Sequence, residues 1–188
     1  MKRPECRWTL RRRLRLGVFT ACPLVLLSCI GDIADRPANR ASDDTKRATL
    51  ERMVTEYHKE FPDVPELIAG ELAMRPAQSR LVLVDVREDT ERGVSMIPGA
   101  VSVKEFERKK PEHKDKTIVM YCTVGYRSGL KAQQLRKEGF DAYNLRGSII
   151  AWVLDGKPVI DPNGDETKRV HVYGQQWNLV PEGYTPVW

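Results

Sequence analysis

Residues 119–130, VMYCTVGYRSGL, place a lone cysteine at the end of an apolar run. Cys122 ends this run, and the short loop that follows contains Gly125 and Arg127. In an open α/β fold, the carboxyl end of such a strand lies at the edge of the sheet where ligands bind. A helix is expected to begin near Ser128, so that its unpaired N–H groups and positive dipole end face the cysteine.

This arrangement predicts an anion cradle around the sulfur of Cys122. Backbone N–H groups that converge on one point favour the thiolate, lower the pKa of the cysteine and suit a nucleophile. Arg127 adds a permanent positive charge and a planar fork for an oxyanion, and Gly125 permits a left-handed turn or a close approach to the ligand. The alternative is a buried, inert cysteine, which is common; the loop, the arginine and the helix together favour function.

Strand and helix patterns alternate on both sides of the loop. Continuous apolar runs at 80–86 and 116–121 predict strands buried on both faces of a parallel sheet, and 97–103 and 141–145 contain shorter strands. Helical spacing is found at 45–61, 65–74, 104–110, 128–140 and 148–156. We therefore expect an N-terminal helix within 45–64, with its N-cap at 43–45, and an α/β domain with a parallel sheet over 65–161.

The first 28 residues are typical of a secretory signal peptide, with an arginine-rich start and an apolar run of about a dozen residues. Its basic residues are Lys2, Arg3, Arg7, Arg11, Arg12, Arg13 and Arg15, against Glu5 alone. Removing this excess of six from the formal net charge of +5 leaves −1 for the rest of the chain. The basic character belongs to the leader, so no nucleic-acid partner is indicated.

The end of this leader, Leu26-Leu27-Ser28-Cys29, is similar to the lipobox of bacterial lipoproteins. That similarity implies a lipidated Cys29, a polar tether over 29–44 and a protein held at the periplasmic face of a bacterial membrane. Two alternatives are an ordinary signal peptide with an incidental cysteine and, on the three consecutive arginines, a twin-arginine signal whose flanking residues fit poorly. Because Cys6 and Cys22 would leave with the leader, Cys122 is expected to be the only free thiol.

Three further segments contain motifs: LVDVRE at 83–88, IPGAVSV at 97–103, and LRGSIIAW followed by GKPV. In this order they resemble the first-strand motif, the second motif and the closing helix and turn of rhodanese-family sulfurtransferases. Four residues separate Cys122 from Arg127, whereas protein tyrosine phosphatases have five, so the loop is one residue short for a phosphate. The resemblance covers roughly 65–160 and implies a rhodanese-like α/β fold, with a parallel sheet flanked by helices on both faces.

By this resemblance, Cys122 is the nucleophile that carries sulfur as a persulfide. The residues expected to bind the sulfur are Thr123, Val124, Gly125, Tyr126, Arg127 and Ser128, with Ser128 also capping the next helix. Asp85 and Arg87 match the Asp-x-Arg of the family, and a structural ion pair is at least as good an explanation for them as a direct catalytic role. The partners would be a small sulfur donor and a thiol or cyanide acceptor, with no metal and no organic cofactor.

Three positions depart from the family pattern. Met96 stands where a histidine is usual and Ser148 replaces the second glycine of a pair, which bears on local packing more than on chemistry. Thr123 stands where enzymes specialised for thiosulfate often carry a basic residue, so thiosulfate is expected to be a surrogate donor. A phosphatase or an arsenate reductase is a third interpretation, which the length of the loop disfavours.

Residues 162–188 have turn formers and aromatics without a helical period, and predict an extension packed on the domain surface. This tail could also bind a partner protein, in which case the domain would be a binding or redox-sensing module and not an enzyme. Trp177 and Trp188 are expected to pack on the surface and not to stack on a ligand. The histidines, at 58, 113 and 171, are too scattered to predict a metal site.

Overall fold

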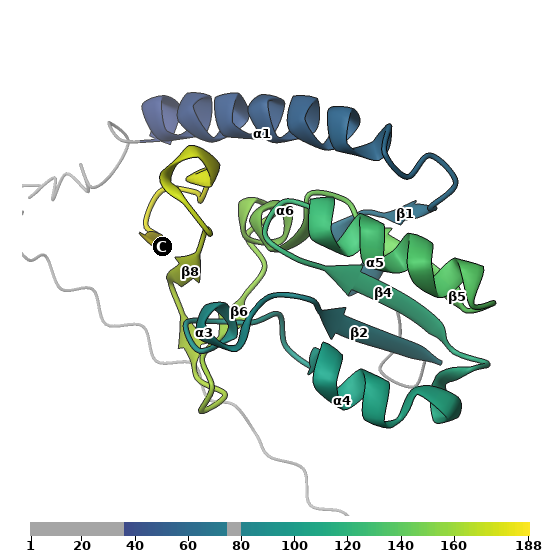
Figure 1. The fold of residues 1–188 in the computed structure, drawn as a ribbon. Helices are drawn as coiled ribbons and strands as arrows, with labels where there is room; N and C mark the ends of the chain where they lie inside the picture. The colour runs from purple at the N-terminus through teal and green to yellow at the C-terminus, as the bar shows by residue number, and fades with distance from the viewer. Residues whose placement is uncertain (1–35, 75–79) are drawn as a thin grey trace, which may run out of the picture. The chain divides into compact units, whose positions relative to one another are not determined.

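A five-stranded parallel sheet forms the centre of the fold (Figure 1). The computed structural model describes residues 36–74 and 80–188. The sheet has the strand order β1-β5-β4-β2-β3, and each neighbouring pair is parallel. Its strands are β1 (Glu66–Leu67), β2 (Leu81–Asp85), β3 (Val101–Ser102), β4 (Thr117–Tyr121) and β5 (Asp141–Leu145). The strands expected from the apolar runs are confirmed.

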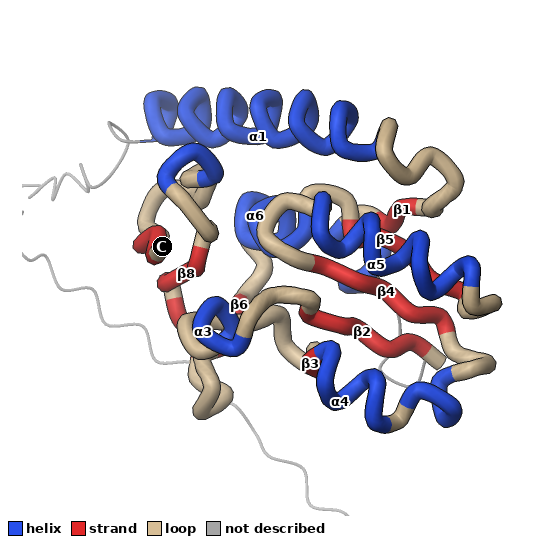
Figure 2. The backbone as a smooth tube through the Cα atoms, viewed as in Figure 1, coloured by secondary structure: helices blue, strands red, loops and turns tan. Residues whose placement is uncertain are grey.

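Helices cover both faces of this sheet, as the sequence predicts (Figure 2). The α-helices are α1 (Arg36–His58), α2 (Ala69–Ala73), α3 (Asp89–Arg92), α4 (Val103–Arg108), α5 (Tyr126–Lys137) and α6 (Ser148–Leu154), and Lys110–His113 and Gln175–Trp177 form 3₁₀ turns. Buried residues of α1, α2 and α6 share one hydrophobic core, and those of α4 and α5 share the other. None of the helices in the described part of the chain is long and apolar enough to cross a membrane.

The burial of β4 on both faces of the sheet explains why its residues Ile118–Tyr121 form a continuous apolar run. Val119 and Tyr121 belong to the core under α6, and Ile118 and Met120 belong to the core under α5. Side chains of a strand alternate between the two faces of a sheet, so a strand covered on both faces must be apolar at every position. Strand β4 lies between β2 and β5 and ends at Tyr121, so the loop that begins with Cys122 starts at the carboxyl edge of the sheet.

Two helices in the first part of the described chain begin at other residues than predicted. Helix α1 begins at Arg36 and not near Thr45, so it takes in part of the expected tether, and it ends at His58. Pro37 does not prevent this early start, because the first helical turn needs no backbone N–H donor. The expected helix at 65–74 also starts late, since Glu66 and Leu67 pair with Asn144 and Leu145 as an edge strand.

The C-terminal extension packs on the domain as expected, and it also adds side chains to the core, which the sequence analysis did not predict. Strands β6 (Val159–Ile160) and β7 (Glu166–Thr167) pair antiparallel, and β8 (Arg169–His171) and β9 (Thr185–Val187) pair parallel. Four side chains of this segment are buried in the same core as α6, namely Val170, Val172, Leu179 and Val180. Because strands of two or three residues are too short to show a hydrophobic period, this packing could not be predicted from the sequence pattern. The expected signal peptide and Cys29 lie outside the described residues.

Candidate active site

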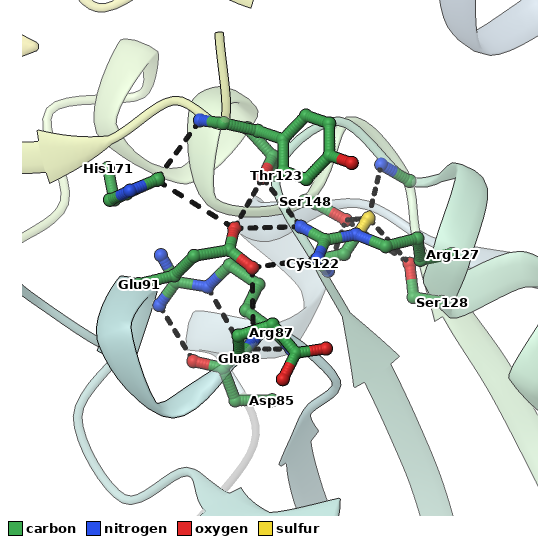
Figure 3. Close-up of polar contacts among 12 residues, drawn as sticks. Asp85, Arg87, Glu88, Glu91, Cys122, Thr123, Arg127, Ser128, Ser148 and His171 are labelled. Atoms are coloured by element: carbon green, nitrogen blue, oxygen red, sulfur yellow. Dashed lines mark hydrogen bonds and ion pairs between the residues drawn. The ribbon is translucent and has the colours of Figure 1, made fainter. Parts of the chain in front are cut away.

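Cys122 lies directly after β4, at the carboxyl edge of the sheet, with three hydrogen-bond donors around its sulfur (Figure 3). The backbone N–H of Gly125 lies 3.2 Å from Sγ, the hydroxyl of Ser128 lies 3.5 Å away and the hydroxyl of Ser148 lies 3.9 Å away. Cys122 is 1% exposed, so these groups replace water around the sulfur. The predicted cradle is therefore present.

The cradle depends on the way in which the chain enters α5. Gly125 has a φ of 109°, in the left-handed region that favours glycine, and it forms the N-cap of α5. The helix therefore begins at Tyr126, and the prediction that Ser128 caps it is wrong. Ser128 lies in the first turn, where the single proton of its buried hydroxyl can be donated to Oδ1 of Asn144 at 2.7 Å or to Sγ of Cys122 at 3.5 Å.

The surroundings of Cys122 favour its thiolate. Burial alone would raise its pKa, because a charged sulfur is poorly solvated inside the protein. The hydroxyl and N–H of Ser128, the positive charge of Arg127 and the N–H of Gly125 outweigh burial, and the pKa of Cys122 is lowered. A thiolate is thereby available at a lower pH than in a free cysteine, as a nucleophile requires.

Arg127 is not a free cation, which the sequence did not predict. Its Nη1 and Nη2 donate to the two carboxylate oxygens of Glu91, at 2.7 and 2.8 Å. Burial opposes ionisation of Glu91, but the hydrogen bonds from Arg127 prevail and hold the pKa of Glu91 below its usual value. The positive charge expected for an oxyanion is thus matched by a carboxylate that is almost fully buried.

The remaining residues of the loop form one side of a cavity of about 410 Å³. Thr123 and Val124 are buried beside Cys122, and Tyr126 at 39% exposure forms part of the rim. The cavity is lined by Tyr57, Cys122, Thr123, Val124, Tyr126, Arg127, Tyr173 and Trp177. Trp177 therefore faces the candidate site, contrary to the expectation of surface packing alone.

Asp85 and Arg87 form a buried ion pair that does not line this cavity. Nε and Nη2 of Arg87 donate to the carboxylate of Asp85 at 2.9 and 2.7 Å, and the hydroxyl of Tyr121 donates to the same carboxylate at 2.6 Å. Nη2 of Arg87 also donates to the carbonyl of Ser95. These contacts support the structural interpretation, because they join the loop after β2 to β4 and to the segment before β3.

Ser148 has a closer connection to the reactive sulfur than the sequence indicated. Its hydroxyl accepts a hydrogen bond from the backbone N–H of Cys122 at 3.0 Å. Its φ of 53° is in the left-handed region, which agrees with the glycine that the family usually has at this position. The replacement of that glycine therefore affects the cysteine itself and not only local packing. Met96, the other departure, lies in a backbone bridge to Ile160 and does not line the cavity.

The sequence analysis did not predict that Glu91, Tyr57 and Tyr173 belong to this site. Glu91 follows β2, the neighbour of β4, so adjacency of these two parallel strands was the signal that could have placed it near Arg127. Tyr57 and Tyr173 come from segments far from the loop in sequence, and no local pattern connects them to it. Within 36–74 and 80–188, no group of three or more His, Cys, Asp or Glu side chains could hold a metal ion.

Comparisons with known proteins agree with this geometry. Residues 69–155 match the family described as rhodanese-like domain. The chain is 35% identical over 106 residues to a sulfurtransferase of Allochromatium vinosum, covering 54% of this chain and 99% of that protein. It is 29% identical over 132 residues to the tRNA uridine(34) hydroxylase of Acinetobacter baumannii, covering 56% of this chain but 42% of that protein.

Among solved structures, a thiosulfate sulfurtransferase of Pseudomonas aeruginosa has a TM-score of 0.50 with this protein at 24% sequence identity. The match covers 68% of this chain and 24% of that chain. At this identity the likeness concerns the fold alone, and it agrees with the parallel sheet and the flanking helices described above.

Proposed function

The chain belongs to the rhodanese-like family, and on that premise we propose that it is a sulfurtransferase in which Cys122 carries sulfur as a persulfide. The observation that carries the proposal is the ring of donors around a buried cysteine of lowered pKa. Such a ring stabilises a negative sulfur both before and after it accepts a second sulfur atom. Support also comes from the related sulfurtransferase of Allochromatium vinosum.

The proposed reaction has two steps. The Cys122 thiolate attacks the outer sulfur of a donor, its electron pair forms the new S–S bond, and the pair of the old bond leaves with the donor. With thiosulfate the products are the Cys122 persulfide anion and sulfite. Cyanide or a thiolate then takes the outer sulfur, and the Cys122 thiolate is regenerated. Neither step calls for a metal or an organic cofactor, and the kinetics should be of the ping-pong kind.

The test is the mass of the intact protein before and after addition of thiosulfate, and again after cyanide. We expect a gain of one sulfur, about 32 Da, that peptide mapping assigns to Cys122 and that cyanide removes. Cys122 is the free cysteine among the described residues, which makes this assignment simple. The absence of any gain, from thiosulfate and from an organic persulfide alike, would sink the proposal.

The binding or sensing module has less support as the function of this domain. That alternative needed residues 162–188 to be available for a protein partner, and Val170, Val172, Leu179 and Val180 are instead buried in the core. A partner protein that docks on the exposed side chains of this segment, such as Trp188, would be compatible with an active enzyme.

We also propose that the protein is exported and anchored by lipid at Cys29, on the periplasmic face of a bacterial membrane. The support is the lipobox-like sequence and the basic, apolar leader before it. We expect metabolic labelling with a fatty acid analogue to mark the wild-type protein. The label should be absent from the Cys29→Ser variant. Labelling that persists in this variant would contradict the proposal, and Cys22→Ser is the matched control within the leader.

A further inference from the structure

Four aromatic side chains form a continuous wall over Cys122, which we call the aromatic wall: Tyr57, Tyr126, Tyr173 and Trp177. The rings of Tyr57 and Tyr126 lie 5.2 Å apart, and those of Tyr173 and Trp177 are also 5.2 Å apart. The indole N–H of Trp177 donates to the hydroxyl of Tyr57 at 3.4 Å and joins the two pairs. This wall is therefore held in place by its own contacts before any ligand arrives.

The cavity is also larger than one small anion needs. Its volume of about 410 Å³ lies in the range that holds small organic molecules. Tyr173 is 57% exposed and has a φ of 68°, although the left-handed region is unfavourable for tyrosine. Its ring covers the guanidinium of Arg127 at 4.9 Å from the ring centroid. The chain thus holds a large aromatic residue at the mouth of the site in a conformation that an L side chain rarely adopts.

The positive and negative side chains around the cavity neutralise each other. Arg127 is the one cation among the described residues that line it, and Glu91 takes both of its terminal nitrogens. His171 lies 3.9 Å from Glu91, and burial lowers the pKa of this histidine, so it adds no positive charge at neutral pH. With a thiolate at Cys122, the local charge is negative, which disfavours the approach of a dianion such as thiosulfate.

Resting on the proposed function, we propose that the site takes sulfur donors and thiol acceptors that carry an apolar, preferably aromatic, organic group and no more than one negative charge. The aromatic wall would hold the organic group, and Glu91 would act as a positioning residue that neutralises Arg127. For an organic persulfide, Cys122 takes the outer sulfur, and the inner sulfur leaves with the electron pair of the broken bond. The proton of the outer sulfur passes to this leaving sulfur, so the products are the Cys122 persulfide anion and a thiol.

With three sulfur donors, the effect of the donor's charge can be measured separately from the effect of aromatic contact. Thiosulfate is a dianion, methanethiosulfonate is a monoanion with a methyl group, and benzenethiosulfonate is a monoanion with a phenyl ring. Each transfers its outer sulfur to the Cys122 thiolate, with sulfite or the corresponding sulfinate as the leaving group. Because their intrinsic reactivities differ, the informative quantity is the change in the ratio of kcat/KM values on substitution, with cyanide as the acceptor in all cases.

Tyr173→Ala and Trp177→Ala are expected to lower the ratio of benzenethiosulfonate to methanethiosulfonate by about fivefold, because the ring contact is lost. Glu91→Gln is expected to raise the ratio of thiosulfate to methanethiosulfonate by about tenfold, because the charge of Arg127 is freed. Trp188→Ala and Asp89→Asn are the matched controls, since Trp188 does not line the cavity and the exposed Asp89 side chain does not contact Arg127. Ratios that stay within about twofold of the wild type in the test variants would overturn the proposal.

Binding of the three donors to Cys122→Ser, measured by titration calorimetry, keeps this proposal separate from the proposed function. The serine removes the thiolate charge, but Glu91 still neutralises Arg127 and the aromatic wall is intact, so we expect benzenethiosulfonate to bind most tightly and thiosulfate least. If the wild type transfers sulfur but the thiosulfate dianion binds best, the proposed function holds and the substrate preference is wrong. If no donor sulfurates Cys122 but the expected order of binding is found, the function fails and the preference of the site holds.

Discussion

Cys122→Ser is expected to abolish sulfur transfer, with a loss of at least about a thousandfold in kcat/KM for any donor. The serine hydroxyl would keep the hydrogen bonds of the cradle, but it has no accessible anion at neutral pH and cannot hold a stable second sulfur. The measurement is thiocyanate formation at saturating cyanide, together with the intact mass, which should show no gain on addition of donor.

Ser128→Ala and Ser148→Ala are the graded controls for this result. Each removes one hydroxyl near Sγ, at 3.5 and 3.9 Å, and leaves the nucleophile in place. We expect losses of about tenfold or less, since the N–H of Gly125 still faces the sulfur. If Cys122→Ser retained as much activity as these two variants, a residue other than Cys122 would be carrying the sulfur.

Asp85→Asn is expected to destabilise the fold by about 3–5 kcal/mol, because it leaves the guanidinium of Arg87 buried without a counter-charge. Both side chains of this pair are 0% exposed, so water cannot replace the lost carboxylate. The hydroxyl of Tyr121, which donates to the same carboxylate, would also lose its charged acceptor. Urea denaturation measures the change, and the melting temperature should fall by about 10 °C.

A second ion pair provides the comparison. Arg80 and Asp115 are 2.8 Å apart with side chains 74% and 71% exposed, and Asp115→Asn should cost less than about 1 kcal/mol. The double variant Asp85→Asn with Arg87→Met should recover part of the loss, because the unpaired charge is removed. If Asp85→Asn costs no more than Asp115→Asn, the pair does not hold the three segments together.

The central strands and the reactive loop were predictable because their sequence signals are local. Strand β4 is apolar from Ile118 to Tyr121 and Gly125 lies three residues after Cys122, so the place of Cys122 follows from a dozen consecutive residues. The cap of α5 was misplaced because Gly125, by its φ of 109°, takes the position expected for Ser128. A sequence motif predicts reliably that a turn of this kind is present, but it predicts less reliably the residue at which the following helix starts.

The partners of the loop were not predictable from local sequence, for a different reason. Glu91 reaches Arg127 only because β2 and β4 are neighbours, and Tyr57 reaches the cavity only because α1 packs against α5 and α6. The strands of the extension have two or three residues each, too few for a hydrophobic period to be read. Such contacts depend on the tertiary arrangement, which a single sequence does not specify by pattern alone.

The aromatic wall has a consequence for selective inhibition. Tyr57, Tyr173 and Trp177 lie outside residues 69–155, the part of the chain that matches the family, whereas the nucleophile lies inside it. A small thiol-directed electrophile would therefore meet a loop shared across the family, while one with an aryl arm would also contact side chains that this chain supplies from elsewhere. Reagents of the second kind should label this protein in preference to relatives that have the same cysteine loop without such a wall.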